Sequence, residues 1–223
     1  MTLDIENLER AIVRHCSPTL AGMKPASLFN VPGAFAADVD EEPAGGMQAW
    51  LAARELSERL DRLVSQVARR LGPSGVCVRV VARRACGALV YVFRPDLLAR
   101  AMSDGRVRER LGEWGYRTAG TGWLDAAIER VGGRLERCHR RDPEAPFPHE
   151  VGFFLGYPYA DVMGFIEHEG KDFLCCGSWK VYAEQERAEA CFERYRRCTR
   201  AYEALLDMGA SMADLALVSL AAA

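Results

Sequence analysis

The clearest β-structure in the sequence is Val76-Cys-Val-Arg-Val-Val-Ala-Arg-Arg-Ala-Cys-Gly-Ala-Leu-Val-Tyr-Val-Phe93. Its two halves, 76–83 and 88–93, are rich in valine and aromatic residues, which favour strands. Residues 84–87 between them end in a glycine, a residue that suits a tight turn. We therefore expect an antiparallel β-hairpin at the centre of a small sheet.

Helices are predicted on both sides of this hairpin, from apolar residues at three- and four-residue spacing. Before it, we expect a helix over 3–16, ended by Pro18, and a long helix over 47–71. A loop between them is expected to end in a short strand near Phe29. After the hairpin, the expected helices cover 95–102, 105–114, 122–138, 149–155, 159–166, 184–208 and 211–223. Gly132-Gly133 is expected to kink or split one of them.

The fold class follows from the order of these elements. Helices outnumber strands, and the alternating rhythm of a doubly wound sheet is missing. We expect an α+β fold in which helices cover a small mixed or antiparallel sheet, made of the 76–93 hairpin plus short strands near 173–182. We expect one domain over 1–223, with a surface loop at 32–46 and a C-terminal helical extension at 199–223.

Composition limits the partners and the compartment. The formal net charge is −2, which gives no electrostatic footprint for nucleic acid. No apolar run approaches the ~20 residues that span a bilayer, and the charged start does not resemble a signal peptide. The eight cysteines include no C-x-x-C pair, so reduced thiols are expected. We therefore expect a cytoplasmic protein with no nucleic-acid or membrane partner, and no particular cofactor is indicated.

The sequence lacks the motifs that are typical of several classes of enzyme and binding protein. His149-Glu150 is not part of an H-E-x-x-H zinc site, because position 153 is Phe. Gly120 and Gly122 do not complete a dinucleotide fingerprint. The sequence also has no Walker A motif, no G-x-S-x-G elbow and no EF-hand loop.

Three segments carry a resemblance to a known family: Pro18-Thr-Leu-Ala-Gly-Met-Lys-Pro-Ala-Ser-Leu-Phe29, Phe147-Pro-His-Glu-Val-Gly-Phe-Phe-Leu-Gly-Tyr-Pro158 with Asp161-Val-Met-Gly-Phe-Ile166, and Gly177-Ser-Trp-Lys-Val-Tyr182. The sequence resembles the bacterial family catalogued as domain of unknown function 3793. The resemblance runs from about residue 10 to Cys198. It implies no established activity, so the candidate residues come from their own chemistry.

Three residues are candidates for catalysis: Cys16, His149 and Glu150. Cys16 is a candidate nucleophile. However, it lies near a helix C-terminus, where the dipole disfavours a thiolate, and on an apolar face. The alternative, which we favour, is that Cys16 is a small buried core residue. His149 begins a predicted helix after Pro148, where the imidazole would favour its neutral form and could serve as a base or metal ligand. Alternatively, His149 and Glu150 simply cap the first turn of that helix.

The three lysines stand out because the other 26 basic residues are arginines. Lys24, Lys171 and Lys180 all lie in or beside the three segments. A compact ammonium can act as a point charge on an anion or change its pKa when buried, which a guanidinium cannot do. We expect Lys24 and Lys180 to bind an anionic ligand and leave Lys171 open. The alternative is chance retention, or stems packed over apolar neighbours.

Aromatic residues of the same segments are candidates for stacking on a planar ligand. Trp179 and Tyr182 lie on opposite faces of a predicted strand, and Tyr157 lies in a Gly-Tyr-Pro turn. The alternative for all three residues is ordinary packing.

Three functions remain open at this point. The first is a binding protein or enzyme whose site for a small anion forms where segments 16–29, 147–158 and 177–182 converge. The second is a metal- or haem-handling protein with Cys16 and His149 as ligands. The third is a non-catalytic protein-interaction domain.

Overall fold

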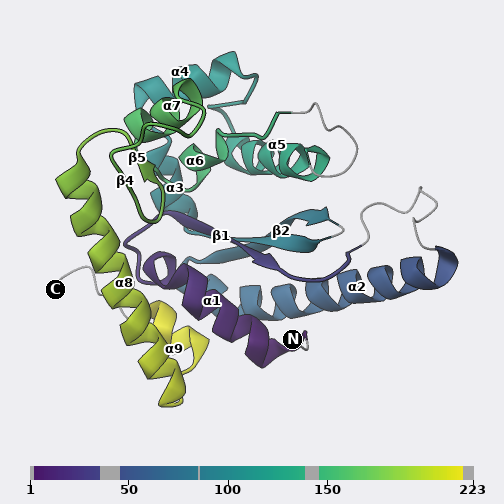
Figure 1. The fold of residues 1–223 in the computed structure, drawn as a ribbon. Helices are drawn as coiled ribbons and strands as arrows, with labels where there is room; N and C mark the ends of the chain where they lie inside the picture. Colours follow the sequence, from purple (N-terminus) through teal and green to yellow (C-terminus); the bar gives the residue numbers. More distant parts are fainter. Residues whose placement is uncertain (1–2, 36–45, 85, 139–145, 218–223) are drawn as a thin grey trace.

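The structure is a computed structural model that describes residues 3–35, 46–84, 86–138 and 146–217. Its centre is a three-stranded antiparallel sheet in the order β1-β3-β2 (Figure 1). The strands are β1 (Ala26–Val31), β2 (Cys77–Arg84) and β3 (Gly87–Phe93). The predicted hairpin is therefore confirmed as β2–β3, and the short strand expected near Phe29 is β1, paired with β3.

Two layers of helices cover the two faces of this sheet, which confirms the α+β class (Figure 1). One face carries helices from both ends of the chain: α1 (Ile5–Leu20), α2 (Gly46–Leu71) and α9 (Met212–Leu217). The other face carries helices from the middle: α3 (Pro95–Ala101), α4 (Gly105–Glu113), α5 (Trp123–Arg137), α6 (Val151–Phe154) and α7 (Tyr159–Glu167). The long helix α8 (Gln185–Asp207) packs against α1.

The central strand β3 divides the apolar residues between two cores by simple alternation. Ala88, Val90 and Val92 belong to the core shared with α1 and α2. Leu89, Tyr91 and Phe93 belong to the core shared with α3–α7. Because β3 is buried on both faces, its residues form a continuous apolar run in the sequence.

The first helix extends beyond its predicted end. α1 continues through Pro18 to Leu20, since a proline near a helix end removes only one of the last backbone hydrogen bonds. The Pro18 carbonyl then accepts from the backbone N–H groups of Met23 (2.8 Å) and Lys24 (3.1 Å). This turn leads directly into β1 and fixes where Lys24 leaves the helix.

The two glycines expected to interrupt α5 do not break it. A Cβ atom on Gly132 would lie 2.5 Å from the carbonyl oxygen of Val81 in β2. Glycine is therefore required because helix and strand pack so closely there. The predicted kink or split at Gly132-Gly133 is therefore wrong, because close packing against β2 accounts for Gly132.

Arg94, directly after β3, ties several chain ends together. Its guanidinium donates to the carbonyl oxygens of Thr19 (2.8 Å), Ser74 (2.8 Å) and Ala216 (3.2 Å), and also to that of Leu20. These acceptors lie at the ends of α1, of the 3₁₀ turn Gly72–Ser74 and of α9. The C-terminal helix is thereby fastened to the sheet layer.

Some predicted features lie outside the described residues. They include residues 36–45 of the surface loop predicted over 32–46, and residues 218–223 of the predicted C-terminal extension. Among the helices that the structure describes, none combines the length and the apolar character needed to cross a bilayer.

Candidate ligand-binding site

A cavity of about 350 Å³ lies between the short hairpin β4 (Cys175–Cys176) and β5 (Lys180–Val181) and the helices α6 and α7. Its volume falls in the range of small-molecule sites. Aromatic rings form much of its wall. The ring of His149 lies 5.2 Å from that of Phe147 and 5.0 Å from that of Phe165, between centroids. A second pair, Tyr157 and Trp179, stacks at 5.0 Å.

Asp161, at the start of α7, holds the wall that carries Trp179. This carboxylate is almost completely buried. Its Oδ2 accepts from the indole Nε1 of Trp179 (2.7 Å), and its Oδ1 accepts from the backbone N–H groups of Tyr182 (2.8 Å) and Ala183 (3.0 Å). Three donors to one carboxylate fix the β5 segment against α7. Asp161 belongs to one of the segments that carry the family resemblance, but the sequence did not predict this anchoring role.

Lys180 brings a positive charge to the cavity. Its Nζ donates to the carbonyl oxygen of Gly170 (2.6 Å). The same atom lies 5.7 Å from the ring centroid of Phe165 and 4.7 Å from that of Phe173. Among the described residues, no carboxylate lies within ion-pair distance of this amine. Lys180 is therefore held in place by neutral partners, and its charge is available to an anion.

His149 lines the same cavity as a neutral imidazole. Burial lowers its pKa, and the neighbouring Glu150 carboxylate offsets only part of that effect. The helix after it, α6, has four residues, so burial rather than a helix dipole is the cause. No other described side chain forms a hydrogen bond with this imidazole, which leaves its two nitrogens for a ligand.

Glu150 points away from the cavity into a separate buried network. Its carboxylate accepts from the hydroxyl of Tyr116 (2.7 Å) and pairs with the guanidinium of Arg134 (2.6 Å). Its side chain is 5% exposed. Glu150 thus links α6 to α5 and to the segment after α4, and it has no access to a ligand beside His149.

Cys16 is completely buried in the core between the sheet and α1. Burial raises the pKa of its thiol to about 12, so the reactive thiolate is scarce at neutral pH. α1 and α6 lie on opposite faces of the sheet, so Cys16 and His149 do not share a site (Figure 1). Among the described residues, no group of three or more His, Cys, Asp and Glu side chains could hold a metal ion.

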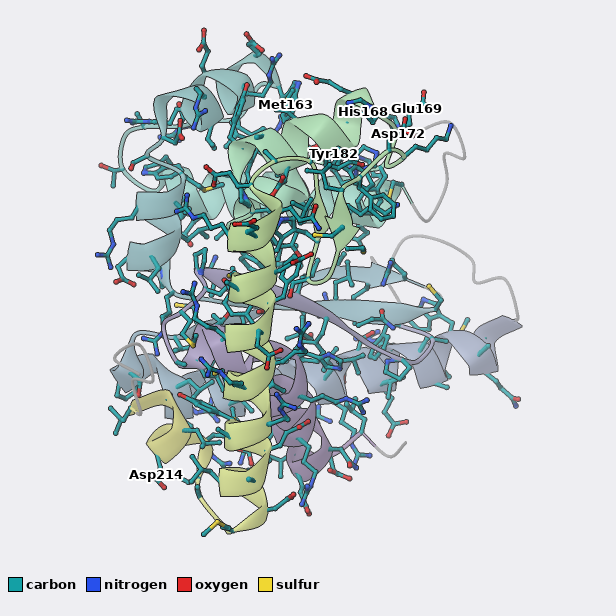
Figure 2. The ribbon with its side chains drawn as sticks, turned by 60° about the vertical axis from the view of Figure 1, so that its left-hand side comes forward. Met163, His168, Glu169, Asp172, Tyr182 and Asp214 are labelled. Atoms are coloured by element: carbon teal, nitrogen blue, oxygen red, sulfur yellow. The ribbon has the colours of Figure 1, made fainter. Side chains whose placement is uncertain are left out.

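Tyr182 lies just outside the cavity. Its ring stacks on His168 at the end of α7, with centroids 5.6 Å apart. Figure 2 shows these two rings close together, with Glu169 and Asp172 beside them. Only the backbone N–H of Tyr182 takes part in the site, through Asp161.

Lys24 lies next to the cavity without lining it. Its Nζ is 5.1 Å from the ring centroid of Tyr157, and its side chain borders a neighbouring cleft. Burial lowers its pKa to about 8. The hydroxyl of Tyr157 donates to the carbonyl oxygen of Ser178 (3.0 Å), a residue common to the cavity and the cleft. The three predicted segments do meet, but around two hollows rather than one.

Several lining residues were not among the predicted site residues; they include Phe147, Phe165 and Cys176. The two phenylalanines stand inside the quoted segments, where their spacing from His149 gives no hint of shared surroundings. Cys176 is exposed at the cavity, and no motif in the sequence singles it out.

These features define an α+β protein with an aromatic cavity, of small-molecule size, beside its second sheet. The chain belongs to the family described as Protein of unknown function (DUF3793), which matches residues 12–216. The match covers every segment that contributes to the cavity. No curated protein and no solved structure matches the chain.

Proposed function

We propose that this protein binds a small planar organic anion, such as an aromatic carboxylate, in the cavity between the β4–β5 hairpin and helices α6 and α7. The observation that carries the proposal is the pairing of aromatic walls with the Lys180 ammonium, which has no described carboxylate within ion-pair distance. Ring faces take up a planar group, and the ammonium takes up its charge.

His149 adds polar recognition to this arrangement. Its neutral imidazole can donate one hydrogen bond and accept another. A cavity with apolar walls and few convergent polar groups is the usual form of a small-molecule site. The ligand class therefore has a flat apolar body and one negatively charged edge.

Catalysis is not part of the proposal. Of the three residues predicted to be catalytic, His149 lines the cavity, whereas Cys16 and Glu150 lie outside it. Cys16 and His149 lie on opposite faces of the sheet, so they cannot bind one metal ion or haem together. The proposed location is the cytoplasm, since the eight cysteines, each within the described residues, form no disulfide.

The test is a titration with naphthalene-2-carboxylate in which two-dimensional NMR monitors the indole N–H signals of the protein. The chain has four tryptophans, and the Trp179→Phe variant assigns the indole signal that reports on the cavity. We expect the Trp179 indole signal to shift as ligand is added and to stop shifting once the cavity is saturated. We also expect the Lys180→Met variant to bind about tenfold more weakly, because one charge-assisted contact is lost.

Lys171→Met is the matched control. Its side chain is 74% exposed and pairs with Glu169, away from the cavity lining. This variant should bind like the unaltered protein. A Trp179 signal that stays in place at millimolar ligand, or equal weakening by both lysine variants, would overturn the proposal.

A further inference from the structure

A second hollow, the basic cleft, lies between the packed helices α1 and α8. Its basic side chains are Arg14, Lys24, Arg196 and Arg200. Hydroxyl groups are present as well, from Ser27, Ser178 and Thr199. The basic cleft differs from the aromatic cavity because four arginine and lysine side chains and three hydroxyl groups are among its lining residues, whereas Lys180 is the only lysine or arginine that lines the cavity among the described residues.

Carboxylates do not balance this charge. Glu193 accepts from Arg196 (2.7 Å) and from Arg200 (3.2 Å), so one acid serves two guanidinium groups. Arg14 and Lys24 have no carboxylate within ion-pair distance among the described residues. The basic cleft therefore carries a local excess of positive charge in a protein whose net charge is −2.

Lys24 is the best-placed of these cations. The chain holds it through the 3.1 Å hydrogen bond from its backbone N–H to the Pro18 carbonyl, and its amine lies over the Tyr157 ring. The side chain is half-buried. Burial lowers its pKa to about 8, so the amine is still mostly charged at neutral pH, and a negatively charged partner would stabilise that charged form further.

We propose that the basic cleft binds the phosphate group of a small molecule, as a site separate from the aromatic cavity. A phosphate monoester carries close to two negative charges at neutral pH and offers three acceptor oxygens. Arginine forks, a compact ammonium and hydroxyl groups are the partners that such a group takes. A carboxylate, with one charge and two oxygens, would leave more of this donor set unused.

The proposal does not depend on the function proposed above, since the two sites use different lysines. Binding of inorganic phosphate and of glycerol 3-phosphate is measured by calorimetry on the whole chain at low ionic strength, in a phosphate-free buffer. We expect saturable binding that weakens at least tenfold in Lys24→Met and in Arg14→Gln. Lys180→Met and Lys171→Met should bind phosphate as the unaltered protein does.

The two probes distinguish the source of the phosphate. Tighter binding of glycerol 3-phosphate indicates a phosphorylated organic molecule, and equal binding indicates free phosphate; both outcomes support the site. No heat of binding at 10 mM of either probe would overturn it. Equal weakening by Lys171→Met would also overturn it, because that pattern indicates unspecific charge attraction. Arg14 is exposed, so its variant keeps the test valid if Lys24→Met destabilises the fold.

Discussion

The Asp161→Asn substitution replaces one carboxylate oxygen by an –NH₂ group and removes one hydrogen bond. In the native protein, Oδ2 accepts from the Trp179 indole at 2.7 Å, and Oδ1 accepts from two backbone N–H groups. Asparagine keeps one oxygen, which can still serve the backbone groups. Its –NH₂ then faces the indole N–H, so two donors meet in a buried place.

The size of the effect follows from these contacts. A hydrogen bond to a charged group contributes about 1.5–3 kcal/mol, and an unsatisfied buried donor costs about 1–3 kcal/mol. Asp161 is 3% exposed, so water cannot replace the lost partner. We expect the free energy of unfolding to fall by about 3 kcal/mol, which lowers Tm by about 6–12 °C for a chain of this size.

The assays are urea unfolding for stability and Trp179 indole NMR for the site. The indole signal should move and broaden as the ring loses its anchor, and naphthalene-2-carboxylate should bind more weakly. Asp172→Asn is the control, because that side chain is 82% exposed and asparagine tolerates its positive φ of 55°. Loss of less than about 0.5 kcal/mol in Asp161→Asn, the size of a surface substitution, would refute the reasoning.

Gly156→Ala should reduce stability by about 2–5 kcal/mol, since φ is +73° and the new Cβ would lie 2.1 Å from Pro25 Cγ; urea unfolding measures it. His149 has a lowered pKa in the folded state, so the unfolded chain takes up its proton first as the pH falls through about 6.5, and stability should decline below that pH. Mass spectrometry after brief iodoacetamide treatment at neutral pH should find Cys176 modified and Cys16 unmodified, because Cys16 is fully buried with a pKa of about 12.

Each of these predictions has its own control. Gly122→Ala shares a positive φ of 69° but meets no atom within 4 Å, so it should cost clearly less than Gly156→Ala. The His149→Gln variant should show a shallower loss of stability on acidification, and an unchanged slope would contradict the assignment. The pKa of His15 is lowered too and leaves a residual slope of the same sign. Modification of Cys16 as fast as Cys176 would contradict its burial.

The sheet could be predicted because its signals are local. The valine-rich halves of 76–93 and the glycine between them determine a hairpin without help from distant residues. The partner of β1 could not be predicted, because pairing Phe29 with Val90 depends on contacts far apart in the sequence. The kink predicted at Gly132 was wrong for the same reason. Glycine is needed there because the carbonyl oxygen of Val81, in another element, packs against it.

The candidate site was only partly predictable. Residue chemistry pointed to His149, Tyr157, Trp179 and Lys180, and all four line the aromatic cavity. The same chemistry cannot reveal which direction a side chain takes. Glu150 follows His149 directly, yet it points into the Tyr116 network rather than the cavity.

The lysine argument has a physical counterpart in the structure. Lys24 and Lys180 place their amines over aromatic rings, at 5.1 Å from the Tyr157 centroid and 4.7 Å from the Phe173 centroid. Lys171, by contrast, is exposed and pairs with an acidic neighbour. Because a ring face holds an ammonium without neutralising it, each of the first two lysines keeps its charge for a further partner. The two amines border different hollows, so the aromatic cavity and the basic cleft can be tested one lysine at a time.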